Sequence, residues 1–462
     1  MFPRALDGAF LDLDTHDAPL HVGWTIRLEG RPPSLGALRR HLAARLDRVP
    51  RLRQRLVATT LAGGARRFED DPVFDVARHV GAVALPPPGG IGELRAAAGV
   101  LLSSPLDPAR PLWRMCAIDG LAGGGWALVG QVHHALVDGI AAVEVAALLL
   151  DAKPDALADP ASAWRPRRAG PRRAAVDAAR SRASSAVGAF RGMGTSGAAE
   201  AGDALRDLLR PAPATSLDRG TGPRRVVAFA DARLQAVRDA GRLRDATVND
   251  VLLAGSAIAL GAALRRRGEG HEELKALIPV SVREAPSDFG NRLSFLVVAL
   301  PVAERDPGRV LDRIAAQTTR AKGSGHAGPV ASLAEGLALL PRRGRALAAR
   351  VALRLAAFNV VVSNVPGPEL PLYLMGRRVA AIHPAVPVPD GHGLTIGALS
   401  YAGRLHIGIY ADAAVVPDAV ELARDVESAF DALRLAPERP DPGETPWRAR
   451  ARSRRTQRET RR

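Results

Sequence analysis

The chain has 462 residues, of which 47% are hydrophobic and 24% charged, and its formal net charge is +16. This composition excludes a disordered or fibrous protein, and the length is enough for two substantial hydrophobic cores. The only cysteine, Cys116, excludes an internal disulfide and a cysteine-rich zinc site. The N-terminal stretch lacks the pattern of a signal peptide. The longest uncharged apolar run, residues 251–264, is shorter than the roughly 20 residues that span a bilayer. We therefore expect a cytoplasmic protein that is soluble or attached to a surface.

The positive charge is concentrated in two short segments. Residues 165–182 carry a net charge of +6 and residues 448–462 carry +7, so the rest of the chain is nearly neutral. Basic clusters of this kind suit an anionic surface, because they displace counterions from it. Biased, solvated sequence is the simpler interpretation of both segments, since arginine is favoured over lysine throughout. No specific nucleic-acid partner is expected.

The first part of the chain alternates helical and strand patterns. Leucine at helical spacing predicts a helix over residues 38–56. Strands are predicted over 111–119 and 126–133, joined as a hairpin by Leu-Ala-Gly-Gly-Gly, and a helix over 140–150. Residues 152–223 are rich in alanine, arginine, proline and glycine without a steady apolar period. We interpret them as a linker with marginal helices at 174–190 and 198–209.

Regular patterning resumes at residue 225. The 247–265 segment is apolar nearly all round, which predicts a buried helix. The other expected elements are strands at 226–229, 276–282, 294–300 and 359–364, a hairpin of 394–401 with 405–410, and a helix at 417–435. The tail is polar, and we expect it to be disordered. The pattern predicts domains at 1–151 and 224–437, a linker at 152–223 and a basic tail at 438–462.

Two of the 11 histidines, His133 and His134, are adjacent at the end of a predicted strand, within His-His-Ala-Leu-Val-Asp-Gly. Successive strand residues point to opposite faces, so we expect one imidazole in a cavity and the other in packing. An imidazole near its ordinary pKa can take a proton from a hydroxyl or thiol at neutral pH. The residues alone leave a second interpretation open, in which both histidines are core residues and Asp138 caps the next helix.

The other motifs in the sequence are weaker evidence for a functional site. Residues 322–328 match Gly-x-Gly-x-x-Gly but follow a helical pattern instead of a strand, so a dinucleotide site is not supported. The serine-nucleophile pattern Gly-x-Ser-x-Gly does not occur. His383, Asp390 and His392 could suggest a metal, but the segment is proline-rich and the spacing is not that of a known ligand set. We expect a turn with exposed histidines there, and we predict no metal.

The stretch from His133 to Gly139 matches the HHxxxDG signature of the coenzyme A-dependent acyltransferase superfamily. Within it, the chain resembles the bacterial wax ester synthase/diacylglycerol acyltransferase family. Further stretches follow in the family's order: SPLDPARPLW (104–113), TVNDVLLAG (247–255), IPVSVR (278–283), GNRLS (290–294), VSNVPGP (362–368) and LSYAGRLHIGIYAD (399–412). One departure is Leu217-Asp218-Arg219, where the family commonly has Leu-Asn-Gly. The resemblance covers most of the chain except the linker and the tail.

The resemblance implies an α/β fold of two acyltransferase-like domains, with mixed sheets flanked by helices and an active-site channel between them. It implies transfer of a fatty acyl group from acyl-coenzyme A, as co-substrate, to the hydroxyl of a diacylglycerol or a long-chain alcohol, without another cofactor. His134 is the expected base. Asn249 is placed near the site, where its amide could donate to the oxyanion.

The resemblance also assigns supporting roles. Asp138 is expected to pair with Arg283 behind the catalytic histidine, and Gly139 to let backbone approach the substrate. The other implied site residues are His133 and Asp250, with Trp113, Ser363, Asn364 and Pro366 shaping the channel.

The implied location is the cytoplasmic face of the membrane or a lipid inclusion, where the basic segments would meet an anionic surface. Two other classes stay open. One is a catalytically idle membrane- or nucleic-acid-binding module, against which the intact HHxxxDG argues. The other is a related transferase acting on a non-lipid alcohol or amine, against which the SNVPGP stretch argues.

Overall fold

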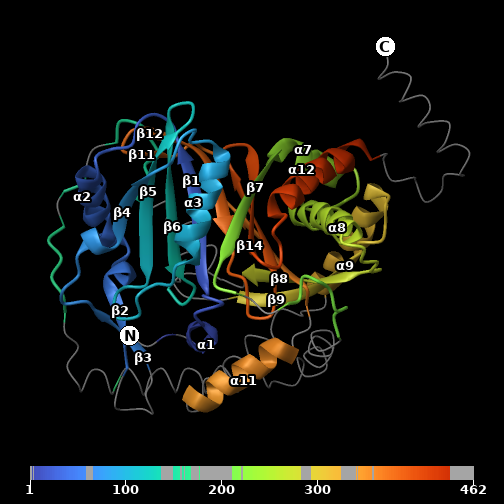
Figure 1. Ribbon diagram of the computed structural model, residues 1–462, viewed down its shortest axis with the longest axis horizontal. Helices are drawn as coiled ribbons and strands as arrows, with labels where there is room; N and C mark the ends of the chain where they lie inside the picture. The colour runs from blue at the N-terminus through green and yellow to red at the C-terminus, as the bar shows by residue number, and fades with distance from the viewer. Residues whose placement is uncertain are drawn as a thin grey trace, which may run out of the picture.

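The computed structural model describes residues 3, 5–58, 66–136, 149–156, 159–160, 162–167, 176, 211–219, 222–281, 293–323, 340, 342–355 and 358–436. In this part of the chain, two six-stranded mixed sheets lie side by side with helices packed against them (Figure 1). A small antiparallel pair, β2 (Gln54–Ala58) and β3 (Arg66–Asp70), completes the strands. The α/β class predicted from the sequence is confirmed.

The first sheet has the strand order β11-β12-β1-β6-β5-β4. These strands are β1 (His21–Leu28), β4 (Val80–Ala84), β5 (Trp113–Leu121), β6 (Gly125–His133), β11 (Tyr373–Leu374) and β12 (Arg377–Ala385). Side chains of β6 alternate between two cores. Trp126 and Leu128 belong to the core that includes helix α2 (Leu35–Arg45), and Val129 to the core that includes α3 (Ile91–Ser103). The strand that ends in His133 is therefore covered on both faces.

The second sheet has the strand order β7-β14-β13-β10-β8-β9. Its strands are β7 (Arg225–Arg233), β8 (Leu274–Ser281), β9 (Leu293–Leu300), β10 (Val360–Pro366), β13 (Leu394–Tyr401) and β14 (Arg404–Asp412). Four helices build the larger hydrophobic core against it: α7 (Leu234–Arg242), α8 (Val248–Arg266), α9 (Pro307–Gly323) and α12 (Ala419–Leu435). The alternate residues Val227 and Tyr410 pack instead with α3 and the first sheet. The second sheet thus faces its helices on one side and the first sheet on the other.

Helix α8 is long and apolar enough to cross a membrane by length and composition, but 72% of its most apolar window is buried inside the protein. It packs against α9 and α12 in the larger core. Because apolar residues surround the helix, it forms the centre of that core, as its sequence predicts.

The two sheets meet along a seam, formed by β12 and α3 on the first side and by β7 and β14 on the second. Strand β12 comes from the second half of the chain, yet it pairs with β1 of the first sheet. A Cβ on Gly408 would clash with the carbonyl of Pro384, so only glycine allows β12 to cross β14 this closely. The expected boundary at residue 224 therefore does not separate the sheets, since β11 and β12 return to the first one.

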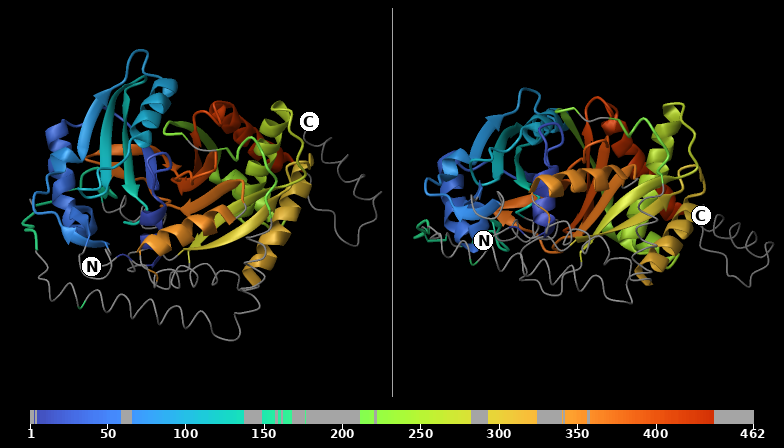
Figure 2. Two further views of the ribbon diagram at one scale, coloured as in Figure 1. Left: turned by 60° about the horizontal axis from the view of Figure 1, so that its bottom comes forward. Right: turned by 90° about the horizontal axis from the view of Figure 1, so that it is seen from below.

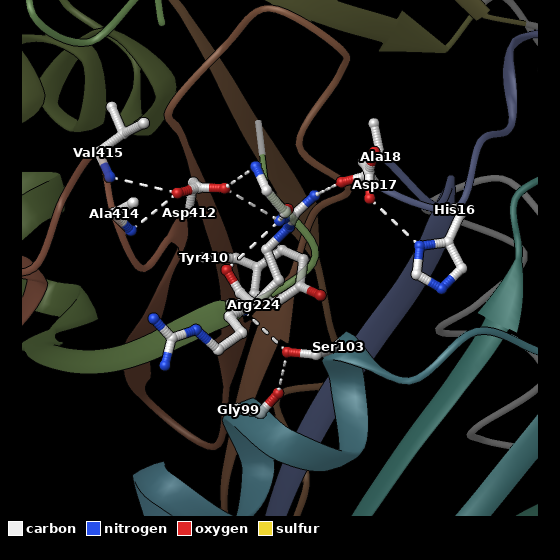
Figure 3. A network of polar contacts seen from close by, with 12 residues as sticks. His16, Asp17, Ala18, Gly99, Ser103, Arg224, Tyr410, Asp412, Ala414 and Val415 are labelled. Atoms are coloured by element: carbon white, nitrogen blue, oxygen red, sulfur yellow. Dashed lines mark hydrogen bonds and ion pairs between the residues drawn. The ribbon is translucent and has the colours of Figure 1, made fainter. Parts of the chain in front are cut away.

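A polar network closes the seam at one end (Figure 3). The guanidinium of Arg225 lies 3.3 Å from the carboxylate of Asp412, and it donates to the carbonyl of Asp17 at 2.5 Å. Both side chains of the ion pair are 1% exposed. The backbone N–H of Arg225 donates to the hydroxyl of Ser103 on α3 at 2.8 Å. Arg225 thus ties the start of β7 to β14, to α3 and to the loop before β1.

Helix α1 (Ala5–Leu13) packs against α11 (Arg342–Leu355); both lie below the sheets in Figure 1 and toward the viewer when the molecule is seen from below in Figure 2. Their contact includes an ion pair of 2.6 Å between Asp12 and Arg345. A helix from the second half of the chain therefore supports the N-terminal helix, which in turn flanks the end of β6.

Most of the predicted elements are confirmed, and one is wrong. The hairpins β5–β6 and β13–β14 and helices α8 and α12 form as expected. The helix predicted over residues 38–56 ends at Arg45, because Pro50 follows and the chain makes two 3₁₀ turns before β2. The expected helices at 174–190 and 198–209, nearly all of 140–150, and the tail from 438 lie outside the described residues.

The described ends of the expected linker are anchored to the hydrophobic cores on either side of it. At its start, the Trp164 ring packs edge-on against Phe74. At its end, Leu217 is 1% exposed, within the larger core. The carboxylate of Asp218 accepts hydrogen bonds of 2.8 Å from the Thr215 hydroxyl and from the Asn359 amide. The Leu-Asp-Arg departure therefore belongs to the entry of the chain into the second sheet.

Candidate active site

Backbone hydrogen bonds hold the histidine pair at the end of β6. His133 N–H donates to the carbonyl of Leu112 at 2.9 Å, and His134 N–H to that of Leu20 at 2.9 Å. In the β1–β6 register, His133 lies opposite His21. The pair is thus fixed between the start of β1 and the approach to β5, where the strand ends.

The side chain of His133 is buried in a polar pocket. Its Nδ1 accepts a hydrogen bond from the N–H of Ala135 at 3.0 Å, which assigns the ring proton to Nε2. Nε2 lies 3.7 Å from the carboxylate of Asp14, and the His21 ring packs edge-on at 5.6 Å. His133 therefore has its partners inside the protein, below the end of the strand.

The electrostatics of this pocket favour an ionised Asp14 and a neutral His21. Burial lowers the pKa of His21 from 6.5 to about 3, with the neighbouring His133 acting in the same direction. Burial raises the pKa of Asp14, but the interaction with His133 and the N–H of Leu20 outweigh it and hold that pKa below its usual value. At neutral pH, an ionised Asp14 therefore faces the proton of His133, while His21 is neutral.

His134 differs from its neighbour in being half-buried. Its ring stacks on that of Phe10 in α1, with 4.1 Å between the centroids and 23° between the planes. Such a contact fixes the ring plane while its edge is left for polar contacts. Of the two histidines, His134 is thus the more exposed to solvent.

Two candidates lie at the N-terminus of α8. Asn249 is half-buried in its first turn. Asp250 is buried, and its carboxylate accepts hydrogen bonds from the N–H and hydroxyl of Thr247, at 2.8 and 2.7 Å, in a capping box. It also accepts one of 2.7 Å from the hydroxyl of Thr318 on α9. These bonds make Asp250 a residue that positions the helix start, including Asn249.

Ser363, Asn364 and Pro366 lie on β10, which runs parallel to both of its neighbours. β10 pairs with β8 only at residues 360–361, whereas it continues along β13 to Pro366. The side chains of Ser363 and Asn364 are half-buried beyond the point where β10 leaves β8. Separating parallel strands open a crevice at their carboxyl ends, a frequent place for ligands.

Trp113 lies on the opposite side of the first sheet from His133. It is 2% exposed, its indole N–H donates to the carbonyl of Leu52 at 2.6 Å, and its ring stacks on His79 at 4.6 Å. Since its register partner is Val132, it faces the core that includes α2. The described contacts of Trp113 are those of a core residue. Asp138, Gly139 and Arg283 lie outside the described residues.

Phe10, Asp14 and His21 complete this site and were not predicted from the sequence. Phe10 and Asp14 precede β1, and His21 begins it. The sequence contains a weak signal, an aromatic residue and several aspartates just before a strand pattern. Only the register of β1 against β6 brings them to the histidine pair.

The expected turn is present at Asp390 and Gly391, but the prediction that the histidines are exposed is wrong. His383 lies on β12 and is 2% exposed, because β12 of the first sheet packs against β13 and β14 of the second. His392 is 8% exposed and stacks on Phe358 at 4.0 Å, with its Nε2 3.0 Å from the Phe358 carbonyl oxygen. Of the three residues considered for a metal, only Asp390 is exposed.

Two mixed sheets joined at a seam, with HHxxxDG at the end of a central strand, define a coenzyme A-dependent acyltransferase fold. Residues 4–252 match the wax ester synthase/diacylglycerol acyltransferase catalytic domain, and residues 289–434 match the C-terminal domain of the same family. The chain belongs to this family, and it is an O-acyltransferase. The match confirms the resemblance seen in the motifs.

Relatives and solved structures agree with this assignment. The chain is 36% identical to a probable diacylglycerol O-acyltransferase of Mycobacterium tuberculosis, tgs1, over 93% of this chain and 94% of that protein. Among structures, the wax ester synthase/diacylglycerol acyltransferase of Marinobacter aquaeolei VT8 superimposes with a TM-score of 0.69 at 25% identity. That match covers 94% of this chain and 99% of the other. The starter condensation domain of rhizomide synthetase shares the fold alone, with a TM-score of 0.60 at 16% identity over 95% of each chain.

Proposed function

We propose that the protein transfers a fatty acyl group from acyl-coenzyme A to the free hydroxyl of a diacylglycerol, with His134 as the general base. The observation that carries this proposal is the half-buried His134 at the end of β6, beside a fully buried His133. The names of the M. tuberculosis relatives favour diacylglycerol over a long-chain alcohol as acceptor. The wax ester synthase name of the Marinobacter protein keeps the alcohol as the second candidate.

The chemistry needs one base and one set of oxyanion donors. His134 takes the proton of the acceptor hydroxyl as its oxygen attacks the thioester carbonyl carbon. The tetrahedral intermediate collapses with cleavage of the carbon–sulfur bond, and the protonated His134 returns its proton to the coenzyme A thiolate. A thioester is already activated, so no covalent enzyme intermediate is required. The amide of Asn249 is our candidate donor to the oxyanion.

His133 and Asp14 contribute by positioning the end of β6. The Ala135 N–H holds the His133 ring, and Asp14 faces its proton, so residues 133–135 at the end of β6 are held in one arrangement. The capping box of α8 does the same for Asn249. We infer that Ser363 and Asn364 line the acyl or acceptor path, since β10 leaves β8 at these residues.

The surface on which the enzyme works follows from its charge and its substrates. Each basic residue near an anionic membrane contributes about 1 kcal/mol of attraction. Residues 448–462 carry a net charge of +7 and residues 165–182 carry +6. We infer peripheral attachment to the cytoplasmic face of a membrane or to lipid inclusions. A protein lacking residues 448–462 should bind phosphatidylserine vesicles less tightly, most visibly at low salt. Equal vesicle binding by the truncated and full-length proteins at every salt concentration would show that residues 448–462 do not contribute to attachment.

Product analysis tests the proposed reaction. Radiolabelled palmitoyl-coenzyme A is offered with equimolar 1,2-dioleoylglycerol, hexadecanol and hexadecylamine, and the products are separated by thin-layer chromatography. The proposal predicts labelled triacylglycerol as the main product, with wax ester second. An amide as main product would favour chemistry of the condensation-domain type. Label found only as free fatty acid would show hydrolysis without transfer. Either result would overturn the proposal.

A further inference from the structure

Three residues far apart in the sequence meet inside the seam. Asp231 of β7 and His406 of β14 are direct cross-strand partners in the second sheet. His383 comes from β12 of the first sheet. Both imidazoles are 1% exposed, and the Asp231 side chain is 25% exposed. The cluster therefore joins the two sheets and reaches solvent only on its carboxylate side.

The side chains already converge on one oxygen. Oδ1 of Asp231 lies 2.5 Å from Nδ1 of His406 and 3.2 Å from Nε2 of His383. The Phe229 ring stacks on His383 at 4.3 Å and limits its movement. The other ring nitrogens, Nδ1 of His383 and Nε2 of His406, are buried without a hydrogen-bond partner in the described part of the chain. The two nitrogens that face Asp231 are therefore the ones placed to bind a ligand together with its carboxylate.

We propose that Asp231, His383 and His406 bind a divalent transition-metal ion of the Zn²⁺ type at the seam. One donor atom from each residue lies within 4.8 Å of the other two. Donors around one zinc ion sit about 2 Å from it, hence about 3–4 Å apart, so ring movements of about 1 Å suffice. Two imidazoles and one carboxylate suit zinc or its neighbours, whereas Mg²⁺ and Ca²⁺ prefer oxygen alone. A fourth ligand can be water on the exposed side of Asp231.

The ion would be structural and separate from the acyl-transfer site. Thr25 is the register partner of His383, and His21 that of His133. These partners are four positions apart along β1, which is about 13 Å. The ion would crosslink β7 and β14 of the second sheet to β12 of the first. This inference does not depend on the proposed acyl transfer.

Metal binding to the purified full chain tests the proposal. Protein stripped with a chelator is titrated with Zn²⁺ by calorimetry, and with Co²⁺ while visible absorption is recorded. The proposal predicts one tight equivalent and the d–d bands of a four- or five-coordinate Co²⁺ site. Asp231→Asn and His406→Gln should each weaken binding by more than about 100-fold, since even loss of an outer-shell partner costs about 10–100-fold.

His271→Gln is the matched control, because His271 also lies beside a carboxylate, 3.3 Å from Glu269, but outside the seam. It should bind both metals like the wild type. If His406→Gln does not fold, the titrations of the wild type and of Asp231→Asn still test the proposal, because the Asp231 side chain is partly exposed and its replacement is better tolerated. A wild-type protein without a tight equivalent, or an Asp231→Asn variant that binds as tightly, would overturn the proposal. The cluster would then be two histidines sharing one carboxylate.

Discussion

The ring of His134, at the end of β6, stacks on the ring of Phe10 in the N-terminal helix at 4.1 Å. The contact joins the proposed base to the helix that α11 supports from the other half of the chain. The orientation of His134 thus depends on packing between distant segments, and the first prediction follows from that dependence.

Replacing Phe10 by leucine keeps apolar bulk but removes the stacked ring. An aromatic contact contributes about 0.5–1.5 kcal/mol beyond area burial, so kcat should fall about 2- to 12-fold with little change in KM. Phe74→Leu is the matched control, because Phe74 also stacks on a histidine, His79, at 5.3 Å. Equal kcat values for Phe10→Leu and the wild type would show that the stack does not orient the base.

The free energy of unfolding should decrease in mild acid because His21 is buried in its neutral form. Its pKa in the folded protein is about 3, against 6.5 for a solvated histidine, so the unfolded chain binds one more proton between these values. The stability associated with neutral His21 is therefore complete above pH 6.5 and is lost as pH falls below it, by up to about 1.4 kcal/mol per pH unit. His21→Gln should flatten the dependence of unfolding free energy on pH between 7 and 5. His16→Gln, at an exposed histidine, should keep the wild-type slope, and an unchanged slope in His21→Gln would contradict the prediction.

Arg225 and Asp412 should be energetically coupled. Removing one partner of a buried ion pair leaves the other charge without compensation, at about 3–5 kcal/mol. Arg225→Met and Asp412→Asn should each lower the free energy of unfolding by an amount of that order, and the double variant by much less than the sum. Additivity within about 0.5 kcal/mol would refute the coupling. The similar pair predicted from the sequence, Asp138 with Arg283, lies outside the described residues and stays a prediction.

Replacing Asp250 should affect the free energy of unfolding more than the rate of the chemical step. Asp250→Ala removes the acceptor of the α8 capping box and of the Thr318 hydroxyl, which should destabilise the protein by about 2–4 kcal/mol. Thr318→Ala removes only one of those bonds and should cost about 1 kcal/mol with kcat unchanged. Unfolding curves and steady-state kinetics of both variants check this. A Thr318→Ala variant that is fully stable but slow would instead place the pair in the chemistry.

The sequence predicts the local part of this structure well. The β5–β6 hairpin, the helix α8 and the position of His133 and His134 at a strand end follow from residue patterns within about 20 positions. The helix predicted to Leu56 is too long, since leucine spacing continues past Pro50 while the backbone cannot stay helical there. Local patterns thus give elements but not all of their ends.

Contacts between distant segments could not be predicted in this way. Phe10, Asp14 and His21 reach the histidine pair only through strand register. His383 looked like a loop residue because its segment is rich in proline, yet β12 crosses into the first sheet and buries it. Its partners Asp231 and His406 are 152 and 23 positions away, a spacing that matches no short ligand motif.

Removal of the His134 imidazole tests the assigned general base most directly. In His134→Ala, release of free coenzyme A during acyl transfer from palmitoyl-coenzyme A to diacylglycerol should fall by about 10²–10⁴-fold. The dissociation constant for palmitoyl-coenzyme A and the unfolding midpoint should stay close to those of the wild type. His16→Ala, at an exposed histidine, should retain wild-type turnover. A folded His134→Ala protein that binds palmitoyl-coenzyme A and turns over at the wild-type rate would contradict the assignment.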